Sequence, residues 1–399
     1  MAEAPWLTIV GLGEDGPAGL PPASRAALDG AEIVTGAARH LALLPDIAAE
    51  RREWPVPFAE GVPHLLALRG RRVVMLASGD PFWFGAGSVI ARHLAAGEWR
   101  ALPGPSTFSL AAARLAWPLE TTCCLGLHAA PLARLRPHLA PGVRAIVLVR
   151  DGAAVGALAD WLTGLGFGAT RLWVLEALGG PRERVRAATA AEYALADVAH
   201  PVAVALEIAG DGAALPVSAG LPDDVFAHDG QITKRPVRAL TLSALAPRPG
   251  ETLWDIGAGS GSVSIEWLLA HPATEAIAIE ADAGRGARAR ANADALGADR
   301  LRVITGRAPD ALADLPPPGA VFIGGGLSEG LLTALWDRLA AGTRVVANAV
   351  TLESEALLTD WQARAGGSLM RVELAQAAPL GTRRGWQAAY PVVQWSVAR

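Results

Sequence analysis

The stretch Asp255–Ser262 reads Asp-Ile-Gly-Ala-Gly-Ser-Gly-Ser, with three glycines at alternate positions. It follows the apolar segment Thr252–Trp254, which predicts a buried strand, and precedes Val263–Ala270, which has helical spacing. Glycines in a turn between a strand and a helix let the backbone approach a ligand closely and point the helix N-terminus at an anionic group. The sequence therefore predicts a ligand site that includes Asp255, Gly257, Gly259 and Gly261.

The glycine spacing separates two kinds of nucleotide site. A dinucleotide-binding turn follows the pattern G-x-G-x-x-G. Here the third glycine of that pattern would fall at position 262, which is Ser262, and the pattern gives no role to Asp255. The spacing D-x-G-x-G-x-G resembles instead the first motif of the Rossmann-like methyltransferases, whose turn holds the methionine end of S-adenosylmethionine (SAM). An NAD-dependent oxidoreductase stays open as an alternative.

Three similar turns lie in the first half of the chain, each after an apolar segment. The expected strands and the turns that follow them are Trp6–Val10 with Gly11–Gly13, Arg72–Ala77 with Ser78–Gly85, and Trp99–Leu102 with Pro103–Thr107. The carboxyl ends of parallel strands are where open α/β sheets bind ligands. Ser106 or Thr107 is expected to cap the helix that runs to Leu115.

Together these turns resemble the signatures of the tetrapyrrole methylase family. The segments Val10–Gly13, Ser78–Gly85 and Pro103–Thr107 match its V-G-x-G, [SG]-G-D-P-x-x-x-G and P-G-x-S-[ST] patterns in order and strand context. The resemblance implies a SAM site between two α/β subdomains, the second running from Thr121 to about Leu215. The cofactor contacts that it implies are Gly11, Gly13, Ser78, Gly79, Asp80, Pro81, Gly85, Pro105, Ser106 and Thr107.

The second half alternates strands and helices from Thr252 to Ala347, which predicts a parallel sheet. Glu280 ends the second strand about twenty residues after the glycine turn, where an acid accepts hydrogen bonds from ribose hydroxyls. The Rossmann-like resemblance implies that backbone groups after the third strand hold adenine. The turn after the fourth strand lacks the Asp or Asn with which amino-methylating enzymes of this class orient a nitrogen nucleophile. Such a turn suits a bulky substrate whose own carbon attacks. The residues concerned are Gly306, Arg307, Ala308, Gly324 and Gly325.

The segment Ala209–Asp224 is rich in Gly, Ala, Pro and Asp and predicts a boundary between domains 1–215 and 216–399. After it, the string G-Q-I-T-K-x-x-V-R at Gly230–Arg238 resembles the segment before the SAM turn of the decarboxylating precorrin methyltransferases. That resemblance adds Gln231 and Thr233 to the expected cofactor contacts. The expected fold class is α/β, with an N-terminal tetrapyrrole-methylase fold and a C-terminal Rossmann-like SAM-dependent methyltransferase fold.

The order of the two halves is similar to that in the decarboxylating precorrin methyltransferases of cobalamin biosynthesis. The resemblance implies two methyl transfers to a corrin precursor, at C5 by the first domain and at C15 by the second. It also implies decarboxylation of the ring C acetate by the second domain, and one SAM site per domain. The same chemistry on a cobalt-containing precursor and a non-catalytic corrinoid-binding protein stay open as alternatives.

A corrin precursor carries many carboxylates, and guanidinium groups bind carboxylates well. A loop at Leu380–Gly385 with two arginines is expected at the mouth of the site, and further polar groups precede the glycine turn or follow the fifth strand. The candidate substrate contacts are Lys234, Arg235, Arg238, Asn348, Thr351, Glu353, Arg383 and Arg384.

The composition of the 399-residue chain bounds its partners and its location. The formal net charge is −4 without a basic run, which argues against nucleic acid as the main partner. No apolar stretch is long enough to span a membrane, and no secretion signal is recognisable, so we expect a cytoplasmic protein. Cys123 and Cys124 are adjacent and the eight histidines are scattered, so no metal site is expected. A homo-oligomer built by the C-terminal domain is expected from the family resemblance.

Overall fold

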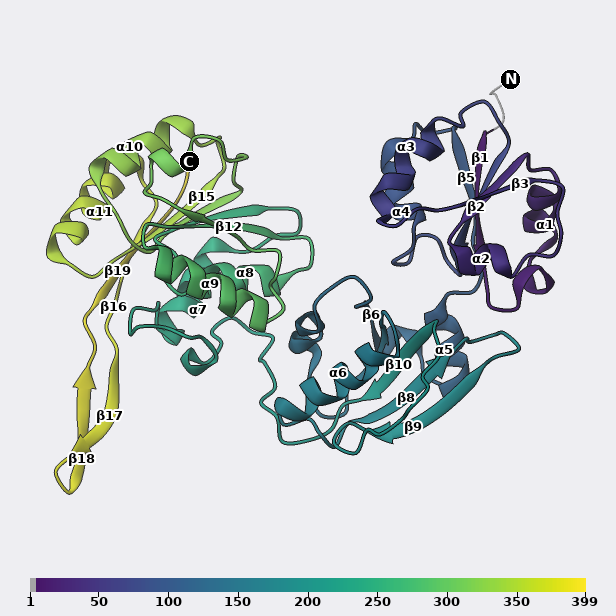
Figure 1. Cartoon of the computed structure of the whole chain (residues 1–399). Coiled ribbons are helices and arrows are strands. Elements are labelled where there is room, and N and C mark those ends of the chain that lie inside the picture. The colour runs from purple at the N-terminus through teal and green to yellow at the C-terminus, as the bar shows by residue number, and fades with distance from the viewer. Residues whose placement is uncertain (1–4) are drawn as a thin grey trace. The chain divides into compact units, whose positions relative to one another are not determined.

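The computed structural model describes residues 5–399 (Figure 1). The chain divides into two compact units. The first comprises the chain up to Ala130 together with His138–Ala213, and the second comprises Pro131–Pro137 together with Ala214–Arg399. Residues 131–137 therefore group with the second unit, although they lie within the expected first domain.

The first unit begins with a five-stranded parallel sheet in the order β3-β2-β4-β1-β5. Its strands are β1 (Leu7–Leu12), β2 (Ile33–Gly36), β3 (Glu50–Glu53), β4 (Val73–Ser78) and β5 (Trp99–Leu102), and its helices are α1 (Pro22–Asp29), α2 (Ala38–Ala42), α3 (Gly61–Leu66) and α4 (Gly87–Ile90). Leu7 and Ile9 of β1 belong to one buried cluster and Val10 and Leu12 to another. Strand β1, which lies inside the sheet between β4 and β5, is thus covered on both faces, as parallel sheets require.

The second sheet of this unit is mixed, in the order β6-β7-β10-β8-β9. Its strands are β6 (Thr122–Gly126), β7 (Arg144–Leu148), β8 (Arg171–Glu176), β9 (Arg184–Thr189) and β10 (Val202–Glu207), with helices α5 (Thr107–Leu115) and α6 (Gly152–Gly164). Ser106 caps α5 by accepting a hydrogen bond from the backbone N–H of Ser109 at 3.0 Å. The capping prediction is confirmed, with Ser106 rather than Thr107 as the cap.

The second unit contains a seven-stranded sheet in the order β13-β12-β11-β14-β15-β19-β16. Its strands are β11 (Thr252–Ile256), β12 (Glu275–Glu280), β13 (Arg302–Thr305), β14 (Ala320–Ile323), β15 (Arg344–Ala349), β16 (Ser368–Val372) and β19 (Val392–Ala398), and its helices are α7 (Arg235–Leu245), α8 (Ser262–Ala270), α9 (Ala283–Ala295), α10 (Glu329–Arg338) and α11 (Leu352–Ala365). The sheet is parallel from β13 to β15, and β19 runs antiparallel to both of its neighbours. The predicted parallel sheet is confirmed.

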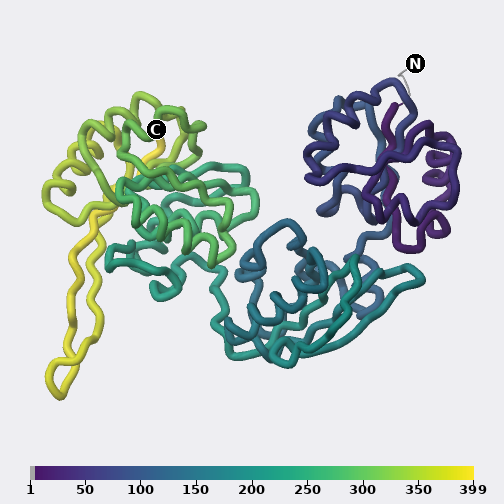
Figure 2. The backbone as a smooth tube through the Cα atoms, viewed as in Figure 1, coloured from purple at the N-terminus to yellow at the C-terminus, as the bar shows by residue number. Residues whose placement is uncertain are grey.

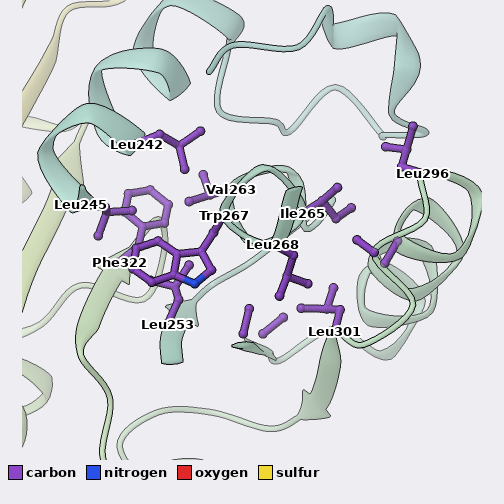
Figure 3. Packing of buried hydrophobic residues seen from close by; sticks show 14 of the residues in the cluster. Leu242, Leu245, Leu253, Val263, Ile265, Trp267, Leu268, Leu296, Leu301 and Phe322 are labelled. Atoms are coloured by element: carbon purple, nitrogen blue, oxygen red, sulfur yellow. The ribbon is translucent and has the colours of Figure 1, made fainter. Parts of the chain in front are cut away.

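A buried cluster joins this sheet to the helices on one of its faces (Figure 3). Trp267 of α8 packs with Leu242 and Leu245 of α7 and with Leu253 and Phe322 of the sheet. Trp267 also donates its indole N–H to the carbonyl of Glu275 at 2.9 Å. The cluster fixes α7 and α8 against the strands, and therefore fixes the turn that joins β11 to α8.

Three local predictions were wrong. The proline-rich sequence of Pro45–Pro63 predicts a loop, but the segment contains β3 and the start of α3, because β3 reads Glu-Arg-Arg-Glu and is a fully exposed strand without an apolar face. The sequence of Leu132–Leu139 predicts an α-helix, but the segment forms a 3₁₀ helix, Leu132–His138, that contains Pro137. The remaining 3₁₀ turns are Gly16–Gly19, Phe58–Glu60, Ala91–His93, Leu119–Thr121, Asp223–Val225 and Asp310–Leu312.

The third wrong prediction concerns the C-terminal strands. The alternating segments Leu369–Gln376 and Trp386–Val397 predict two long strands, and the chain instead forms four, because β17 (Ala375–Leu380) and β18 (Arg383–Ala388) pair only with each other. This hairpin extends away from the seven-stranded sheet as a narrow two-stranded ribbon, drawn in yellow in Figure 2. The expected loop at 380–385 is therefore the tight tip of a hairpin.

Candidate functional site

Three glycine-containing turns of the first unit meet at the carboxyl ends of β1, β4 and β5. The N–H of Gly104 donates to the carbonyl of Gly79 at 3.0 Å, and the N–H of Gly79 donates to the carbonyl of Leu12 at 3.1 Å. A Cβ atom on Gly11 would lie 1.8 Å from the Gly79 carbonyl oxygen and 2.4 Å from the Gly104 nitrogen. Only glycine fits at Gly11, because the backbones of the three turns touch there.

These turns form one side of a cavity of about 560 Å³ in the first unit. The expected cofactor contacts that line it are Gly13, Ser78, Gly79, Asp80, Gly85, Pro105, Ser106 and Thr107. Gly11 and Pro81 are absent from the lining. Gly11 lies behind the surface at the junction of the turns, and the Pro81 carbonyl packs 2.5 Å from the Cβ position of Gly85. Both residues therefore contact and support the residues that line the cavity without lining it themselves.

A cluster of charged and polar side chains that sequence reasoning missed lies on the cavity wall. Arg39 pairs with Glu14 at 2.7 Å and also donates to the Ser78 hydroxyl. Arg182, from the turn after β8, reaches the other oxygen of Glu14 at 2.9 Å. Burial, followed by the charge of Arg39, lowers the pKa of His40 to about 3, so its Nε2, 3.2 Å from the Ser78 hydroxyl, belongs to a neutral ring. The cluster fixes the orientation of the Ser78 hydroxyl in the cavity.

The glycine turn of the second unit has the backbone geometry that its sequence predicts. Gly257, Gly259 and Gly261 have φ values of +70°, +58° and +74°, which favour glycine. A Cβ atom on Gly257 would lie 2.6 Å from the Cα of Gly325, at the end of β14. The backbones after β11 and β14 therefore approach as closely as two glycines allow.

Glu280 ties this turn to the two neighbouring strands. One carboxylate oxygen accepts the N–H of Gly259 at 2.8 Å, and the other accepts the N–H of Asp282 at 3.0 Å. The carbonyl of Glu280 accepts the N–H of Gly306, after β13, at 2.9 Å. The structure thus brings Glu280, Gly259 and Gly306 together at the carboxyl edge of the sheet.

Asp255 lies beneath the turn. Its side chain is buried, and one oxygen accepts both the N–H and the hydroxyl of Ser264, at 3.1 and 2.6 Å. The other oxygen and the buried hydroxyl of Ser260 have no hydrogen-bond partner among the described residues. Burial raises the pKa of Asp255 to about 6. Asp255 therefore positions the first turn of α8 from beneath, and its second oxygen is buried in the protein rather than open to a ligand.

A polar segment, residues 226–233, lies against the glycine turn and is held there by Asn292 of α9. The Asn292 amide oxygen accepts the N–H of Ala227 at 2.8 Å, and its nitrogen donates to the carbonyls of Ala227 and Ser260, both at 2.9 Å. The Gln231 carbonyl oxygen is 3.7 Å from the Cβ position of Gly259. Gln231 is thus brought to the turn, and Asn292 is a positioning residue that no local motif marked.

The other expected contacts after β13 and β14 lie at the same edge. The N–H groups of Gly324 and Gly325 both reach the carbonyl of Ile256, at 2.9 and 3.3 Å. Arg307 is exposed and Ala308 is half-buried. The backbone carbonyl of Thr233 accepts a hydrogen bond from Arg238, so Thr233 belongs to the base of the polar segment.

The prediction that Arg238 contacts the substrate was wrong. Its side chain is fully buried, pairs with Glu266 and Asp223, and lies over the ring of Phe226 at 4.9 Å. It also donates to the carbonyl of Leu221, while Glu266 accepts backbone N–H groups from the same segment. Arg238 lies on the core-facing side of α7, where it anchors the segment that enters the unit.

The remaining candidate substrate contacts are dispersed. Lys234 and Arg235 are exposed at the start of α7, and Thr351 caps α11 by accepting the N–H of Ser354 at 3.2 Å. Asn348 donates to Thr241 at 2.9 Å and accepts from Gln394 at 2.9 Å, so its amide is fixed, whereas Glu353 is exposed.

Arg383 and Arg384 lie at the tip of the β17–β18 hairpin (Figure 1). The hairpin begins beside the carboxyl end of β15, where Ala349 is paired with Val393. The tip itself is not part of the edge that carries the glycine turns.

Residues 5–399, which the structure describes, include neither a membrane-spanning helix nor a metal-ligand cluster. In that range no helix combines the length and apolar character needed to cross a membrane. Within the same residues, no three His, Cys, Asp or Glu side chains are grouped as ligands for a metal ion.

Both halves of the chain match family models. Residues 6–194 match the model for tetrapyrrole (corrin/porphyrin) methylases, and residues 224–399 match the model for a precorrin methyltransferase domain. Thus each glycine-lined site lies in a segment that is similar to known methyltransferase domains.

Several relatives are similar to the chain over most of its length. A Sinorhizobium protein named precorrin-6Y C(5,15)-methyltransferase [decarboxylating] is 52% identical over 398 residues, which cover 98% of this chain and 96% of that protein. A Mycobacterium tuberculosis H37Rv protein of the same name is 42% identical over 400 residues, covering 98% and 100%. The solved C-terminal domain of precorrin-6Y C5,15-methyltransferase from Rhodobacter capsulatus is 59% identical and covers 46% of this chain and 100% of that domain, with a TM-score of 0.45.

Proposed function

Because the chain belongs to the precorrin-6Y C5,15-methyltransferase (decarboxylating) family, we propose that it methylates precorrin-6B at C5 and C15. It also removes carbon dioxide from the acetate on ring C, which gives precorrin-8. The chain is a SAM-dependent C-methyltransferase. The observation that carries the proposal is that one chain contains two separate glycine-lined sites, one in each unit.

Each unit is proposed to hold one SAM molecule. In the first unit, Gly13, Ser78, Gly79 and Thr107 line a cavity whose volume, about 560 Å³, lies in the range of small-molecule sites. In the second unit, Gly257, Gly259 and Gly261 place no side chain between the backbone and a ligand. Glu280 offers carboxylate oxygens there, and Asp255, buried beneath the turn, holds the first turn of α8 in place. These groups fit a ligand with ribose hydroxyls and an amino-acid end.

The cofactor supplies an electrophilic methyl group on a sulfonium centre. The meso carbons of the reduced macrocycle are enamine-like nucleophiles, so the protein's main task is to align the reacting atoms. The close backbone packing at Gly11 and Gly257 gives each site a rigid floor for that alignment. After C15 is methylated, the cationic, imine-like ring accepts the electron pair that the acetate releases when its carboxyl carbon leaves as carbon dioxide.

The division of labour is part of the proposal. The first unit methylates C5, and the second methylates C15 and removes the carboxyl group. Lys234, Arg235, Arg383 and Arg384 are proposed to bind substrate carboxylates, since all four are exposed. A cobalt-containing precursor would carry its metal within the substrate, so the same residues would serve it. Fusion of both activities in one chain favours the metal-free substrate.

We also propose that the enzyme works in the cytoplasm and as a homo-oligomer assembled through the second unit. The β17–β18 hairpin and the segment after it expose Leu380, Trp386 and Tyr390 by 70%, 80% and 87%. Apolar side chains gathered on one arm are typical of an association surface. Size-exclusion chromatography with light scattering tests this, and a monomer at micromolar concentration would contradict it.

Mass spectrometry of the product from precorrin-6B and SAM tests the function. Gly79→Ala and Gly257→Ala are matched variants, because both glycines have positive φ and a backbone atom 2.6 Å from the Cβ position. The full chain should add two methyl groups and remove one carbon dioxide. Gly79→Ala should give the product with one methyl added and one carbon dioxide lost, and Gly257→Ala the product with one methyl added and no loss.

Each alternative predicts a different result. Tight binding of NADH without binding of S-adenosylhomocysteine would indicate an oxidoreductase. Binding of the macrocycle without any change in mass would indicate a carrier. Either result would overturn the proposed function.

A further inference from the structure

The turn after β4 carries three consecutive aromatic residues that no cofactor motif explains. Phe82, Trp83 and Phe84 fill the variable positions between Pro81 and Gly85, and they are 42%, 38% and 47% exposed. Trp83 and Phe84 line the cavity of the first unit, whereas Phe82 does not and packs instead on Trp99, with ring centroids 5.4 Å apart. Adjacent aromatic residues on one turn are thus divided between the cavity and the exterior.

The two cavity-lining rings rest on the same support. Trp83 lies 4.9 Å and Phe84 lies 5.9 Å, between ring centroids, from Phe108 in the first turns of α5. Phe108 itself is 1% exposed. The support is therefore part of the core, and the rings of Trp83 and Phe84 are held in fixed positions with their outer surfaces open to the cavity.

Phe84 has a strained backbone. Its φ of +56° lies in the left-handed region, which a bulky side chain rarely adopts. Its ring occupies the space beside Gly126 at the end of β6, where a Cβ atom would lie 2.8 Å from the ring carbons. Strain of this kind persists where the surrounding structure imposes it, and it is concentrated at functional sites. Here the strain turns a half-exposed phenyl ring into the cavity.

The apolar wall of the cavity extends beyond this turn. Val56 and Phe58, from the segment before α3, also line the cavity and are 91% and 37% exposed. Trp54 fixes Phe58, because its ring stacks at 4.9 Å and its indole N–H donates to the Phe58 carbonyl at 2.9 Å. Arg39, held by its ion pair with Glu14, places a guanidinium in the same lining. A broad aromatic surface with a guanidinium beside it fits a large, partly conjugated ring that carries carboxylates.

We propose that Trp83 and Phe84 form an aromatic platform that holds the face of the tetrapyrrole macrocycle during methylation by the first unit. The proposal rests on the proposed function and adds the residues that determine how the substrate is seated. The platform lies on the turn that begins with Ser78 and Gly79, so the macrocycle is seated beside the residues expected to contact the cofactor.

The test is steady-state kinetics of the full chain with precorrin-6B and SAM, with each methylation product resolved by mass. Trp83→Leu should raise the KM of the first methylation about tenfold or more, because an open aromatic face is lost from the contact with the macrocycle. Trp83→Tyr should restore most of the affinity. Phe82→Leu is the matched control and should leave the KM within about twofold, because Phe82 does not line the cavity.

Two readouts separate the possible outcomes. In Trp83→Leu, methylation and decarboxylation by the second unit should be unchanged. If the unmodified chain shows neither activity, the proposed function is refuted. Calorimetric titration with S-adenosylhomocysteine should give unchanged affinity at both sites. A loss of that affinity at the first site with an unchanged KM for the macrocycle would show that the platform holds adenine, and would overturn the proposal.

Discussion

The two glycine-lined sites differ in how many separate segments of the chain form them. In the second unit, one strand–turn–helix segment supplies Gly257, Gly259 and Gly261, and Glu280 closes the turn from the neighbouring strand. In the first unit, the floor exists only because the turns of Gly11, Gly79 and Gly104 meet. The second site thus depends on the turn itself and on the close approach of Gly257 to Gly325, whereas at the first site three backbones meet at a single point.

The largest effect should follow from a methyl group at that junction. Gly11→Ala places a Cβ atom 1.8 Å from the Gly79 carbonyl oxygen, so one of the three turns must move. We expect methylation at C5 to fall by about a hundredfold or more, since displacements near 1 Å can cost that much. Product mass spectrometry should still show methylation at C15 and decarboxylation.

Gly164→Ala is the control for this substitution. Gly164 is the last residue of α6 in the first unit, and no neighbouring group lies within 4 Å of its Cβ position. The variant should keep the first activity. Equal losses in Gly11→Ala and Gly164→Ala would contradict the importance of the three-turn junction.

Removal of the Asn292 amide should weaken the second site next. Asn292→Ala breaks three hydrogen bonds that hold residues 226–233 and the Ser260 carbonyl together. Each bond contributes about 1 kcal/mol, so we expect S-adenosylhomocysteine to bind the second site about ten- to a hundredfold more weakly. Calorimetric titration should show the first site unchanged. Asn292→Asp keeps one acceptor and loses both donors, so it should not restore the affinity.

Replacement of the Glu280 carboxylate at the end of β12 should have a smaller effect. Glu280→Gln retains one acceptor oxygen but presents an NH₂ group to the N–H of Gly259 or of Asp282. A hydrogen bond to a charged group is worth about 1.5 kcal/mol at the lower end of its range, which predicts a loss of affinity for S-adenosylhomocysteine of about tenfold. Unchanged calorimetric affinity at the second site would show that the backbone alone fixes the turn.

The last effect should come from Asp255, and it concerns stability and should depend on pH. Burial raises the pKa of its carboxyl from the usual value near 4 to about 6, so the folded state favours the protonated form. The unfavourable contribution of the charged form is absent below about pH 4, grows between about pH 4 and pH 6, and is complete above that range. It amounts to at most about 3 kcal/mol.

Thermal unfolding of Asp255→Asn measures this contribution. The stability of the variant relative to the unmodified chain should rise from about pH 4 to about pH 6 and then stay constant. A difference independent of pH would show that Asp255 has an ordinary pKa. The matched variant Ser264→Ala should enlarge the pH dependence, because the Ser264 hydroxyl stabilises the charged form.

The secondary structure could be predicted wherever burial imposes a pattern. The apolar run Ala320–Ile323 predicts a strand with the bounds of β14, because short apolar runs between turn residues are typical of buried parallel strands. Strand β3 has no apolar residue and joins the sheet edge only through its backbone, so no pattern marks it. Both outcomes follow from what each strand buries.

The sites could be predicted only where they are local. The glycine turns and Glu280 follow from spacing, because their geometry depends on a few neighbouring residues. Arg39 and Asn292 are set by contacts with residues distant in sequence, which spacing does not encode. The prediction that Arg238 contacts the substrate failed for a related reason. Its place beside a recognisable motif does not show that its side chain is buried in an ion pair with Glu266.

The arrangement of the turn after β4 bears on how the enzyme can change over evolutionary time. Gly79 at one end of that turn is confined by the backbones of its neighbours, and Gly85 by the carbonyls of Asp80 and Pro81. Between these two glycines, the side chains of Trp83 and Phe84 reach the cavity. Mutations can therefore alter the shape of the substrate surface while the frame that aligns the cofactor stays intact. Because few side chains form the substrate surface and the backbone beneath them is fixed, a small number of mutations could change which macrocycle the site binds.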